Sequence, residues 1–427
     1  MRHAIPMVVV ALALGACGVP KGENAPADTG PYVNVEVDSG PSWYRDVLPI
    51  VEENCQGCHL PGGIAPFSLD SYESASAMHL AMADAVAMRR MPPWKPDDAC
   101  RPLKHSRRLS DAHIQTIVQW SERGAREGDR ADAPPPSMTR LGLEWVDATV
   151  SPEAPYVPNR DVSDDYRCFV VPPALSAQKD IIGFDVVPGT PKQVHHVILF
   201  ALPEGEARAL DASEPGLGWT CYGGPGTQSL NLRMVGGWVP GSTATRYPEN
   251  TGVRIRSGHV LVMQVHYNLA GGAPQQDHTQ VRLQYATSPV RDPALVFPIT
   301  ISNFNIPPSS TGYTASGTFS LSQIVPAFLL PSLKVYGVTP HMHELGRRIT
   351  VRNATTNECL VDVPDWDFHW QQSYEYQTPF DVKNEDEIEI SCTWDNPGPR
   401  AVRYGEGTAD EMCMNFFYVT GLPGFLL

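Results

Sequence analysis

The spacing of hydrophobic residues along the chain changes at about residue 150. Before this point apolar residues recur at helical spacing in three stretches, Trp43 to Asn54, Tyr72 to Arg90 and Ser110 to about Gly124. The second stretch has to end at Pro92-Pro93, because proline cannot continue a helix, and the side chain of Ser110 can cap the third. We therefore predict a small all-helical domain at residues 41–125. A linker without periodicity follows it at residues 126–149.

From residue 150 onward short runs of alternating hydrophobic and polar residues are separated by turn residues, a pattern that predicts β-strands. About 270 residues of this pattern are too many for one sandwich. We therefore predict two all-β antiparallel sandwiches of the jelly-roll-like type, at residues 150–290 and 291–427. The clearest predicted strands are Ile181 to Val187, Val194 to Leu202, Val253 to Ile255, His259 to Tyr267, Val281 to Tyr285, Val335 to Val338, Ile349 to Val351 and Glu387 to Thr393.

Composition supports this multidomain, strand-rich organisation. The chain has 427 residues, 41 prolines and 35 glycines, with only 19% charged residues, which is typical of many short strands joined by turns. The formal net charge of −15 excludes nucleic acid as a natural partner, because the phosphate backbone would be repelled.

The N-terminal segment has the features of an export signal. Arg2 supplies a positive charge, and the apolar run from Ile5 to Ala16 is shorter than the ~20 residues that a membrane-spanning helix needs. The sequence Leu14-Gly15-Ala16-Cys17 resembles a bacterial lipobox. The resemblance implies a lipoprotein signal peptide at residues 1–17, lipid attachment to Cys17 and a tether at residues 18–40. The alternative is an ordinary signal peptide with a chance cysteine. We expect a periplasm-facing lipoprotein of the bacterial cell envelope, and Gly18 after the modified cysteine favours the outer membrane.

Cys55-Gln56-Gly57-Cys58-His59 is a C-x-x-C-H motif at the end of a predicted helix. Two thiols at this spacing can each bond a haem vinyl carbon, and the adjacent imidazole then faces the iron. The alternatives are a thioredoxin-like redox pair or half of a zinc site. Neither a βαβ pattern nor a second C-x-x-C accompanies the motif, so we predict a covalently attached haem c.

The second axial ligand of this haem is predicted to be Met91. It lies in Arg90-Met91-Pro92-Pro93-Trp94, where the end of a helix holds the thioether in place, and His79 is the competing residue. Together with the closing helix that carries Trp120, these motifs resemble a class I cytochrome c. The resemblance implies that residues 41–125 pass single electrons.

Five histidines of the second half form another candidate site. His341 and His343 would lie on one face of a strand about 7 Å apart and could grip one ion. His195 and His196 would point to opposite faces of a regular strand, so both can bind one metal only if the strand bends or bulges there or if one ring uses its other nitrogen. His266 closes a third predicted strand. Each histidine alone is better explained as a core residue, whereas five in one exported β-rich chain indicate metal binding.

The order of motifs HH, QVHY, H-x-H and EMC resembles the copper type II ascorbate-dependent monooxygenases, the family of the peptidylglycine α-hydroxylating and dopamine β-monooxygenases. The resemblance covers about residues 150 to 421. It implies two copper ions: the first is held by His195, His196 and His266, and the second, which binds oxygen, by His341, His343 and Met412. Taken alone, Met412 would more often be a core residue.

The resemblance also implies two disulfides and a substrate class. The disulfides are Cys168–Cys221 and Cys392–Cys413, and the sequence leaves two alternatives for Cys100 and Cys359, a third bridge or two free thiols. Thr339 and Phe416 stand where peptide-amidating members have an arginine and a tyrosine that bind a carboxylate. We therefore expect a small neutral or aromatic substrate. Gln264 either lines the cleft between the sandwiches or makes a hydrogen bond within its strand.

These features predict a copper-dependent monooxygenase that hydroxylates a C–H bond of a small organic substrate with O₂. The fused haem c would relay electrons from an external donor, either ascorbate or a redox protein. The alternative is a copper-binding or electron-transfer lipoprotein without hydroxylase activity.

Overall fold

The structure is a computed structural model that describes residues 40–61, 63, 65–135, 142–227, 229, 231–240, 242, 244–269, 272–323, 325–405, 407 and 409–423. The predicted signal peptide, Cys17 and nearly all of the predicted tether lie outside these residues. Within them, none of the helices has the length and apolar character that crossing a bilayer requires.

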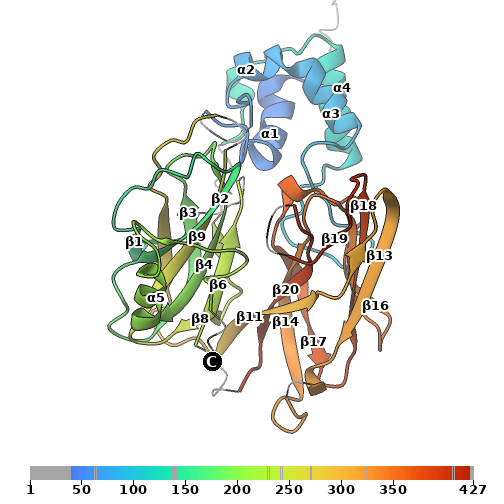
Figure 1. Cartoon of the computed structure of the whole chain (residues 1–427). Coiled ribbons are helices and arrows are strands. Elements are labelled where there is room, and N and C mark those ends of the chain that lie inside the picture. Colours follow the sequence, from blue (N-terminus) through green and yellow to red (C-terminus); the bar gives the residue numbers. More distant parts are fainter. Residues whose placement is uncertain are drawn as a thin grey trace, which may run out of the picture. The chain divides into compact units, whose positions relative to one another are not determined.

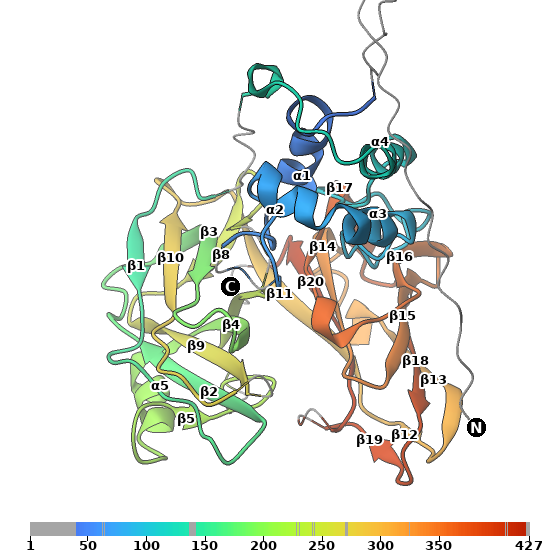
Figure 2. The same cartoon turned by 90° about the horizontal axis from the view of Figure 1, so that it is seen from above.

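The N-terminal helices pack around a core of their own, and we call residues 43–125 the helical unit. Trp43 and Trp120 meet at the centre of this core with ring centroids 5.8 Å apart. Helices α3 and α4 lie side by side (Figure 2). The elements are the π-helical turn η1 (Trp43–Val47) and the helices α1 (Leu48–Asn54), α2 (Tyr72–Ala77), α3 (His79–Ala87) and α4 (Asp111–Glu122).

The ends of these helices follow local sequence signals. Ser110 caps α4 by accepting a hydrogen bond from the backbone N–H of His113, as predicted. The single helix predicted from Tyr72 to Arg90 is wrong, because Met78, at φ −110° and ψ 8°, is not helical and separates α2 from α3. Ser71 supplies a capping box that starts α2, but the sequence offers no comparable signal for the break itself.

The first sandwich consists of two sheets with strand orders β5-β2-β9-β4-β6 and β1-β10-β3-β8, where β7 also pairs with β3 (Figure 1). A core that includes Phe169, Phe184 and Tyr267 fills the space between them. A helix, α5 (Glu204–Asp211), follows β4. The strands are β1 (Ala148–Val150), β2 (Asp164–Val171), β3 (Lys179–Val187), β4 (Val194–Pro203), β5 (Trp219–Thr220), β6 (Arg233–Trp238), β7 (Thr245–Arg246), β8 (Thr251–Ile255), β9 (His259–Asn268) and β10 (Gln280–Tyr285).

The second sandwich pairs the strand order β11-β20-β14-β17 with β13-β18-β15-β16, and Trp394 and Tyr376 are among its fully buried residues. The two short strands β12 and β19 pair with each other. The strands are β11 (Asp292–Ile301), β12 (Asn305–Ile306), β13 (Ser310–Phe319), β14 (Ser332–His341), β15 (Gly346–Asn353), β16 (Glu358–Val363), β17 (Tyr374–Lys383), β18 (Ile388–Asn396), β19 (Val402–Arg403) and β20 (Cys413–Thr420). The predicted architecture of mostly antiparallel β-sheets is confirmed.

One sheet continues from the first sandwich into the second. The start of β11 pairs in parallel with β8, and the rest of β11 pairs antiparallel with β20. Tyr418 of β20 stacks on Tyr247 with ring centroids 4.7 Å apart, and the Tyr418 hydroxyl hydrogen-bonds the Thr251 hydroxyl at 3.0 Å. These contacts join the two sandwiches along a shared edge.

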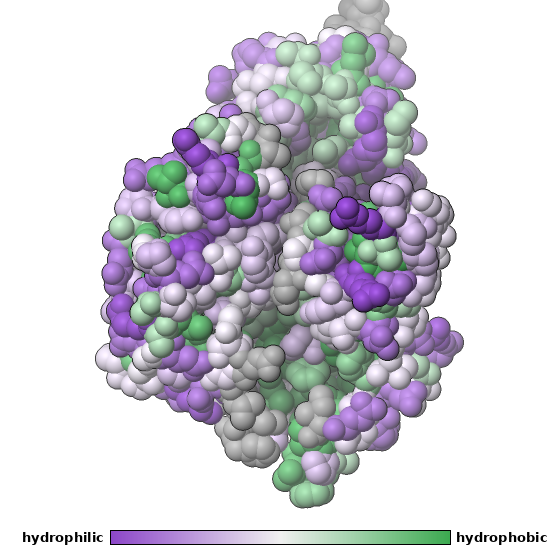
Figure 3. Space-filling model, viewed as in Figure 1, coloured by the Kyte–Doolittle hydropathy of each residue, from purple (hydrophilic) through white to green (hydrophobic). Residues whose placement is uncertain are grey.

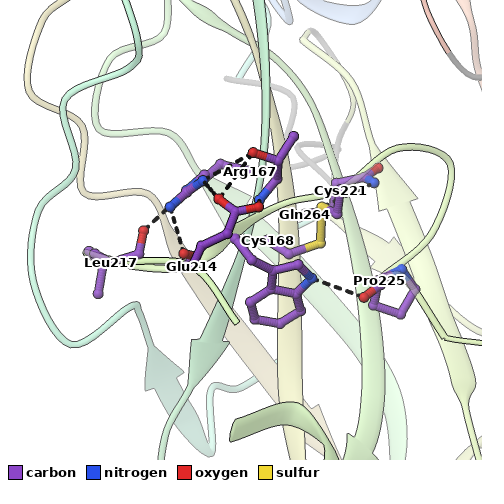
Figure 4. The surroundings of a disulfide bond; sticks show 10 residues. Arg167, Cys168, Glu214, Leu217, Cys221, Pro225 and Gln264 are labelled. Carbon is purple, nitrogen blue, oxygen red and sulfur yellow. Dashed lines mark hydrogen bonds and ion pairs between the residues drawn. A yellow bond between two sulfur atoms is a disulfide. The ribbon is translucent and has the colours of Figure 1, made fainter. Parts of the chain in front are cut away.

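Three disulfides staple the described residues. The predicted pairs Cys168–Cys221 and Cys392–Cys413 are both confirmed, and the first is surrounded by a small core with Gln264 beside it (Figure 4). The question that the sequence left open for Cys100 and Cys359 is also answered, because these residues form the third bridge.

The bridge Cys100–Cys359 fastens residues 94–104, which we call the strap, to the second sandwich. The Trp94 ring meets the edge of Tyr374 at 5.3 Å, and the backbone N–H of Lys104 donates to the Glu375 carbonyl at 2.7 Å. The helical unit is therefore tied to the sandwich that carries β17. On the face shown in Figure 3, hydrophilic side chains cover much of the two sandwiches, as expected for sheets that bury one side.

Candidate metal centre

Three histidines of the first sandwich converge on one point. His195 and His196 lie on β4, and His266 lies on the neighbouring strand β9. One ligand atom from each lies within 4.8 Å of the others, which is the spacing of a shared metal ion. The register of β4 against β9 shifts between Val194 and His196. A bend or bulge here was one of the two ways in which the sequence allowed consecutive histidines to reach one ion, and the shifted register agrees with it.

The ring of His266 is held from both sides. Its Nε2 lies 2.8 Å from Asp164 Oδ1, and the Tyr166 ring stacks on it at 4.0 Å. The hydrogen bond from His266 lowers the pKa of Asp164, so the carboxylate is ionised and accepts the proton on Nε2. The lone pair of His266 is thus on Nδ1, which lies 3.4 Å from His196 Nδ1. His266 is predicted to bind metal through that atom.

The charge state of these rings suits a metal ligand. Burial and the nearby His266 push the pKa of His196 well below its ordinary value. Burial also lowers the pKa of His266, against the opposing effect of Asp164. Both imidazoles are therefore neutral at physiological pH, as coordination requires.

The second group of histidines lies at the end of β14. His341 is the last residue of this strand and His343 follows two positions later, with ring centroids 5.2 Å apart. Met342 between them is fully buried in the core, so the predicted alternation holds, although the strand itself stops at His341. Burial and the neighbouring His343 lower the pKa of His341 to about 3, and burial lowers that of His343.

Hydrogen bonds fix the orientation of both rings. The Nδ1 of His343 donates to the Asp410 carbonyl at 3.0 Å, because a carbonyl can only accept. The Nδ1 of His341 lies 2.6 Å from Gln371 Oε1, whose amide is oriented by a second hydrogen bond from Nε2 to the Phe368 carbonyl at 2.9 Å. Nδ1 is therefore occupied in each ring, and Nε2 is the nitrogen that would bind a metal.

The segment that carries Met412 wraps around His343. The Glu411 side chain, fully buried at 0% exposure, accepts hydrogen bonds from the backbone N–H groups of His343 at 3.0 Å and Leu345 at 2.6 Å. It also accepts from Trp394 Nε1 at 2.9 Å and from the N–H of Met412 at 3.3 Å. Burial raises the pKa of Glu411 to about 7. Met412 is thus bonded through one carboxyl group to the turn that bears His343.

The C-x-x-C-H motif lies at the end of α1, where Cys55 and Cys58 are unbridged. The Nδ1 of His59 donates to the Phe67 carbonyl at 3.0 Å, which leaves Nε2 available, and burial lowers the pKa of His59. His79 is occupied differently, since its Nδ1 lies 2.8 Å from the Ser121 hydroxyl. Met91 follows α3 and is 37% exposed, so its axial role stays a prediction.

Sequence reasoning missed or misplaced some residues of the site. Asp164 and Gln371 were not predicted, because nothing in their sequence neighbourhood marks them as partners of His266 and His341. Glu411 stood inside the EMC motif without an assigned role. The suggestion that Gln264 lines the cleft is wrong: it is 1% exposed, and its Nε2 points at the sulfur of Cys221, 3.6 Å away.

Two family models match the chain. The model for the N-terminal domain of the copper type II ascorbate-dependent monooxygenases matches residues 150–272, and the model for the C-terminal domain matches residues 294–420. The two matches together cover more than half of the chain. They contain all six of the predicted copper ligands.

Curated relatives agree with this family. DBH-like monooxygenase protein 2 of Mus musculus is 24% identical over 392 residues, which are 84% of this chain and 62% of that protein. Putative DBH-like monooxygenase protein 2 of Homo sapiens is 23% identical over 277 residues, 61% of this chain and 54% of that protein. The alignments thus span little more than half the length of these relatives. Among solved structures, the major capsid protein P2 from Bacteriophage PM2 matches 65% of this chain and 98% of its own at 7% identity, but its TM-score of 0.26 supports no conclusion.

Proposed function

The chain belongs to the copper type II ascorbate-dependent monooxygenases, and we propose that it hydroxylates a C–H bond of a small organic substrate with O₂. The overall reaction consumes one O₂, two electrons and two protons, and yields the alcohol and one water. Copper, when bound, supplies the one-electron redox chemistry that activates O₂.

One observation carries this proposal. In three of the five imidazoles a protein group occupies one ring nitrogen and leaves the other to face a metal: Asp164 does this for His266, Gln371 for His341 and the Asp410 carbonyl for His343. Imidazole nitrogens suit copper in either oxidation state, and the thioether of Met412 favours Cu(I). The donor set of this chain therefore fits two copper ions, with His195, His196 and His266 at the first site and His341, His343 and Met412 at the second.

The remaining residues have supporting tasks. Asp164 and Gln371 orient the ligand rings, and the Glu411 carboxyl group holds the turn that carries His343 next to Met412. The bridge Cys392–Cys413 fixes the start of the strand that follows Met412. These contacts hold the ligands in place before any metal binds, which reduces the cost of ordering them.

We further propose that a haem c bound at Cys55, Cys58 and His59, with Met91 as the second axial ligand, relays electrons from an external donor, either ascorbate or a redox protein. The free thiols and the available His59 Nε2 support this proposal. With Cys17 as a lipid attachment site, the protein would be a periplasm-facing lipoprotein of the bacterial cell envelope, in the outer membrane.

The test begins with the metal-loaded full chain. We expect two coppers per chain, one covalent haem, and O₂-dependent formation of a hydroxylated product from a screen of phenethylamines, phenols and glycine-extended peptides. His343→Ala should abolish product formation and remove one copper. Product from no member of the screen, with both coppers bound, would favour a copper-binding or electron-transfer protein instead.

The haem relay is tested separately by following the haem absorbance. Reduced haem should be reoxidised by oxygen only when copper and substrate are both present. Reoxidation at an equal rate without copper would contradict the relay while leaving the hydroxylase proposal intact.

A further inference from the structure

The side chain of Phe368 lies between the two groups of histidines. It belongs to the short 3-10 turn η4 (Phe368–Trp370), in the segment that joins β16 to β17. Its ring stacks on that of His195, with centroids 5.6 Å apart and planes 24° apart. The same ring meets His343 edge-on at 5.9 Å. One phenyl ring thus contacts an imidazole of each proposed copper site, and it is only 8% exposed.

The turn that carries Phe368 is anchored on both sides of this residue. Before it, Lys95 of the strap forms ion pairs with Asp365 at 2.8 Å and Asp367 at 3.8 Å. After it, Gln371 binds the Phe368 carbonyl and the His341 ring. The phenyl group itself is an apolar side chain held by packing. The anchors can therefore stay in place while the ring moves by rotation about its own side-chain bonds.

The space that the ring fills is the space a substrate needs. A C–H bond that is hydroxylated at the second site has to lie beside His341, His343 and Met412, and Phe368 already packs against His343 from the side of the first site. A ring between two imidazoles at these distances makes the contacts that aromatic pairs prefer. The protein's own side chain therefore shows which group fits there: one flat, uncharged ring.

We propose, on the basis of the proposed monooxygenase function, that Phe368 is a plug that takes the place of the substrate's aromatic ring and leaves it when the substrate binds. The substrate class is then small neutral molecules with one aromatic ring.

The plug makes a prediction about affinity. If only a fraction of molecules has the ring withdrawn, the apparent dissociation constant is the intrinsic one divided by that fraction. Removing the phenyl ring makes every molecule competent to bind, so the apparent dissociation constant falls to the intrinsic one. A residue that instead forms a wall of the substrate site would lose contacts on truncation, and binding would weaken.

The experiment measures binding of 2-phenylethanol to the full chain by calorimetry, both metal-free and copper-loaded in oxygen-free solution. We expect Phe368→Ala to bind it about tenfold more tightly than the natural chain. 2-Cyclohexylethanol, which has similar size but no flat ring, should bind both proteins more weakly, whereas its fold-gain in Phe368→Ala should be similar because the same fraction of molecules is made competent to bind. Phe328→Ala is the matched control, because Phe328 is 83% exposed and lies in the segment between β13 and β14. It should leave both affinities unchanged.

A second measurement follows the plug in the natural chain. Trp370 belongs to η4, and its contribution to the fluorescence emission is the part that is lost in Trp370→Phe. This contribution should change when 2-phenylethanol binds. Unchanged or weaker binding by Phe368→Ala would refute the plug. If that variant does not fold, Phe368→Leu serves in its place, with a gain of the same sign. Because binding is measured without turnover, absence of hydroxylated product under oxygen would count against the proposed function and not against the plug.

Discussion

Asp164 offers a direct test of how the first site is built. Its carboxylate accepts from His266 Nε2 at 2.8 Å and from the Asn268 side-chain amide at 3.2 Å. In Asp164→Asn the new amide can turn its N–H₂ group towards Nε2, and the imidazole proton then moves to Nδ1. That atom is the one that faces His196 and would bind the metal. The substitution therefore changes a tautomer while hardly changing the volume of the side chain.

The expected magnitude follows from the role of this hydrogen bond. Loss of a carboxylate that orients a metal-bound histidine typically lowers metal affinity by about 10-fold to 100-fold. This corresponds to about 1.4 to 2.7 kcal/mol. The Asp164 pKa is lowered by the hydrogen bond from His266, so the carboxylate adds stability above its unfolded pKa, and this contribution is lost as the pH falls through its folded pKa. The difference in unfolding free energy between the natural chain and Asp164→Asn should therefore vanish in acid.

The assay is a competition titration of Cu(I) between the protein and a chelator of known affinity. Asp164→Asn should bind one of the two copper ions less tightly, whereas its affinity for the copper at His341 and His343 should be unchanged. Asp161→Asn is the matched control, since it removes the same charge from an exposed side chain three positions away. Equal copper affinities for Asp164→Asn and the control would refute the assigned tautomer of His266.

Three further outcomes are expected. The double variant Cys100→Ala/Cys359→Ala removes a bridge that spans 259 residues and is worth up to about 5 kcal/mol in chain entropy, so limited proteolysis should release the helical unit before the sandwiches are cut. Glu411→Gln replaces a carboxylate that accepts several hydrogen bonds with an amide whose N–H₂ group cannot accept them. The free energy of unfolding of the metal-free protein, measured by chemical denaturation, should therefore fall by about 2 to 4 kcal/mol. An unchanged denaturation midpoint would contradict this role of Glu411. Cys55→Ser/Cys58→Ser should abolish covalent haem, read by mass and absorption, with copper content unaltered.

The strands that could be predicted are those rich in apolar and β-branched residues. The predicted run from His259 to Tyr267 agrees with β9, and Val281 to Tyr285 agrees with β10. The strand β13 was not among the clearest predictions because its residues are mainly Ser, Thr and Gly, half-exposed and without an apolar period. The strand β11 contains Pro298, which is tolerated because β8 pairs only with its first residues, Asp292 to Ala294.

The candidate ligands could be named from the sequence, whereas the residues that orient them could not. Histidine and methionine motifs are short patterns that can be recognised in the sequence, and an irregular strand at His195 was one of the two expected ways of bringing consecutive residues to one ion. Asp164 reaches His266 only because β2 pairs with β9 in the register that places Tyr166 opposite His266. Such a register depends on the whole sheet. The pairing of Cys100 with Cys359, 259 residues away, likewise depends on the folded arrangement and could not be predicted from local sequence.

The position of the strap bears on how the helical unit and the second site are related. Lys95 pairs with Asp365 and Asp367, which precede η4, and Gln371, which directly follows η4, orients His341. The Trp94 ring meets Tyr374, three residues after Gln371. A displacement of the helical unit would therefore be transmitted through one short segment to both Phe368 and His341. A haem carried by this unit would be fixed to the sandwich that holds the second site, so the plug and the electron donor would share the same anchor.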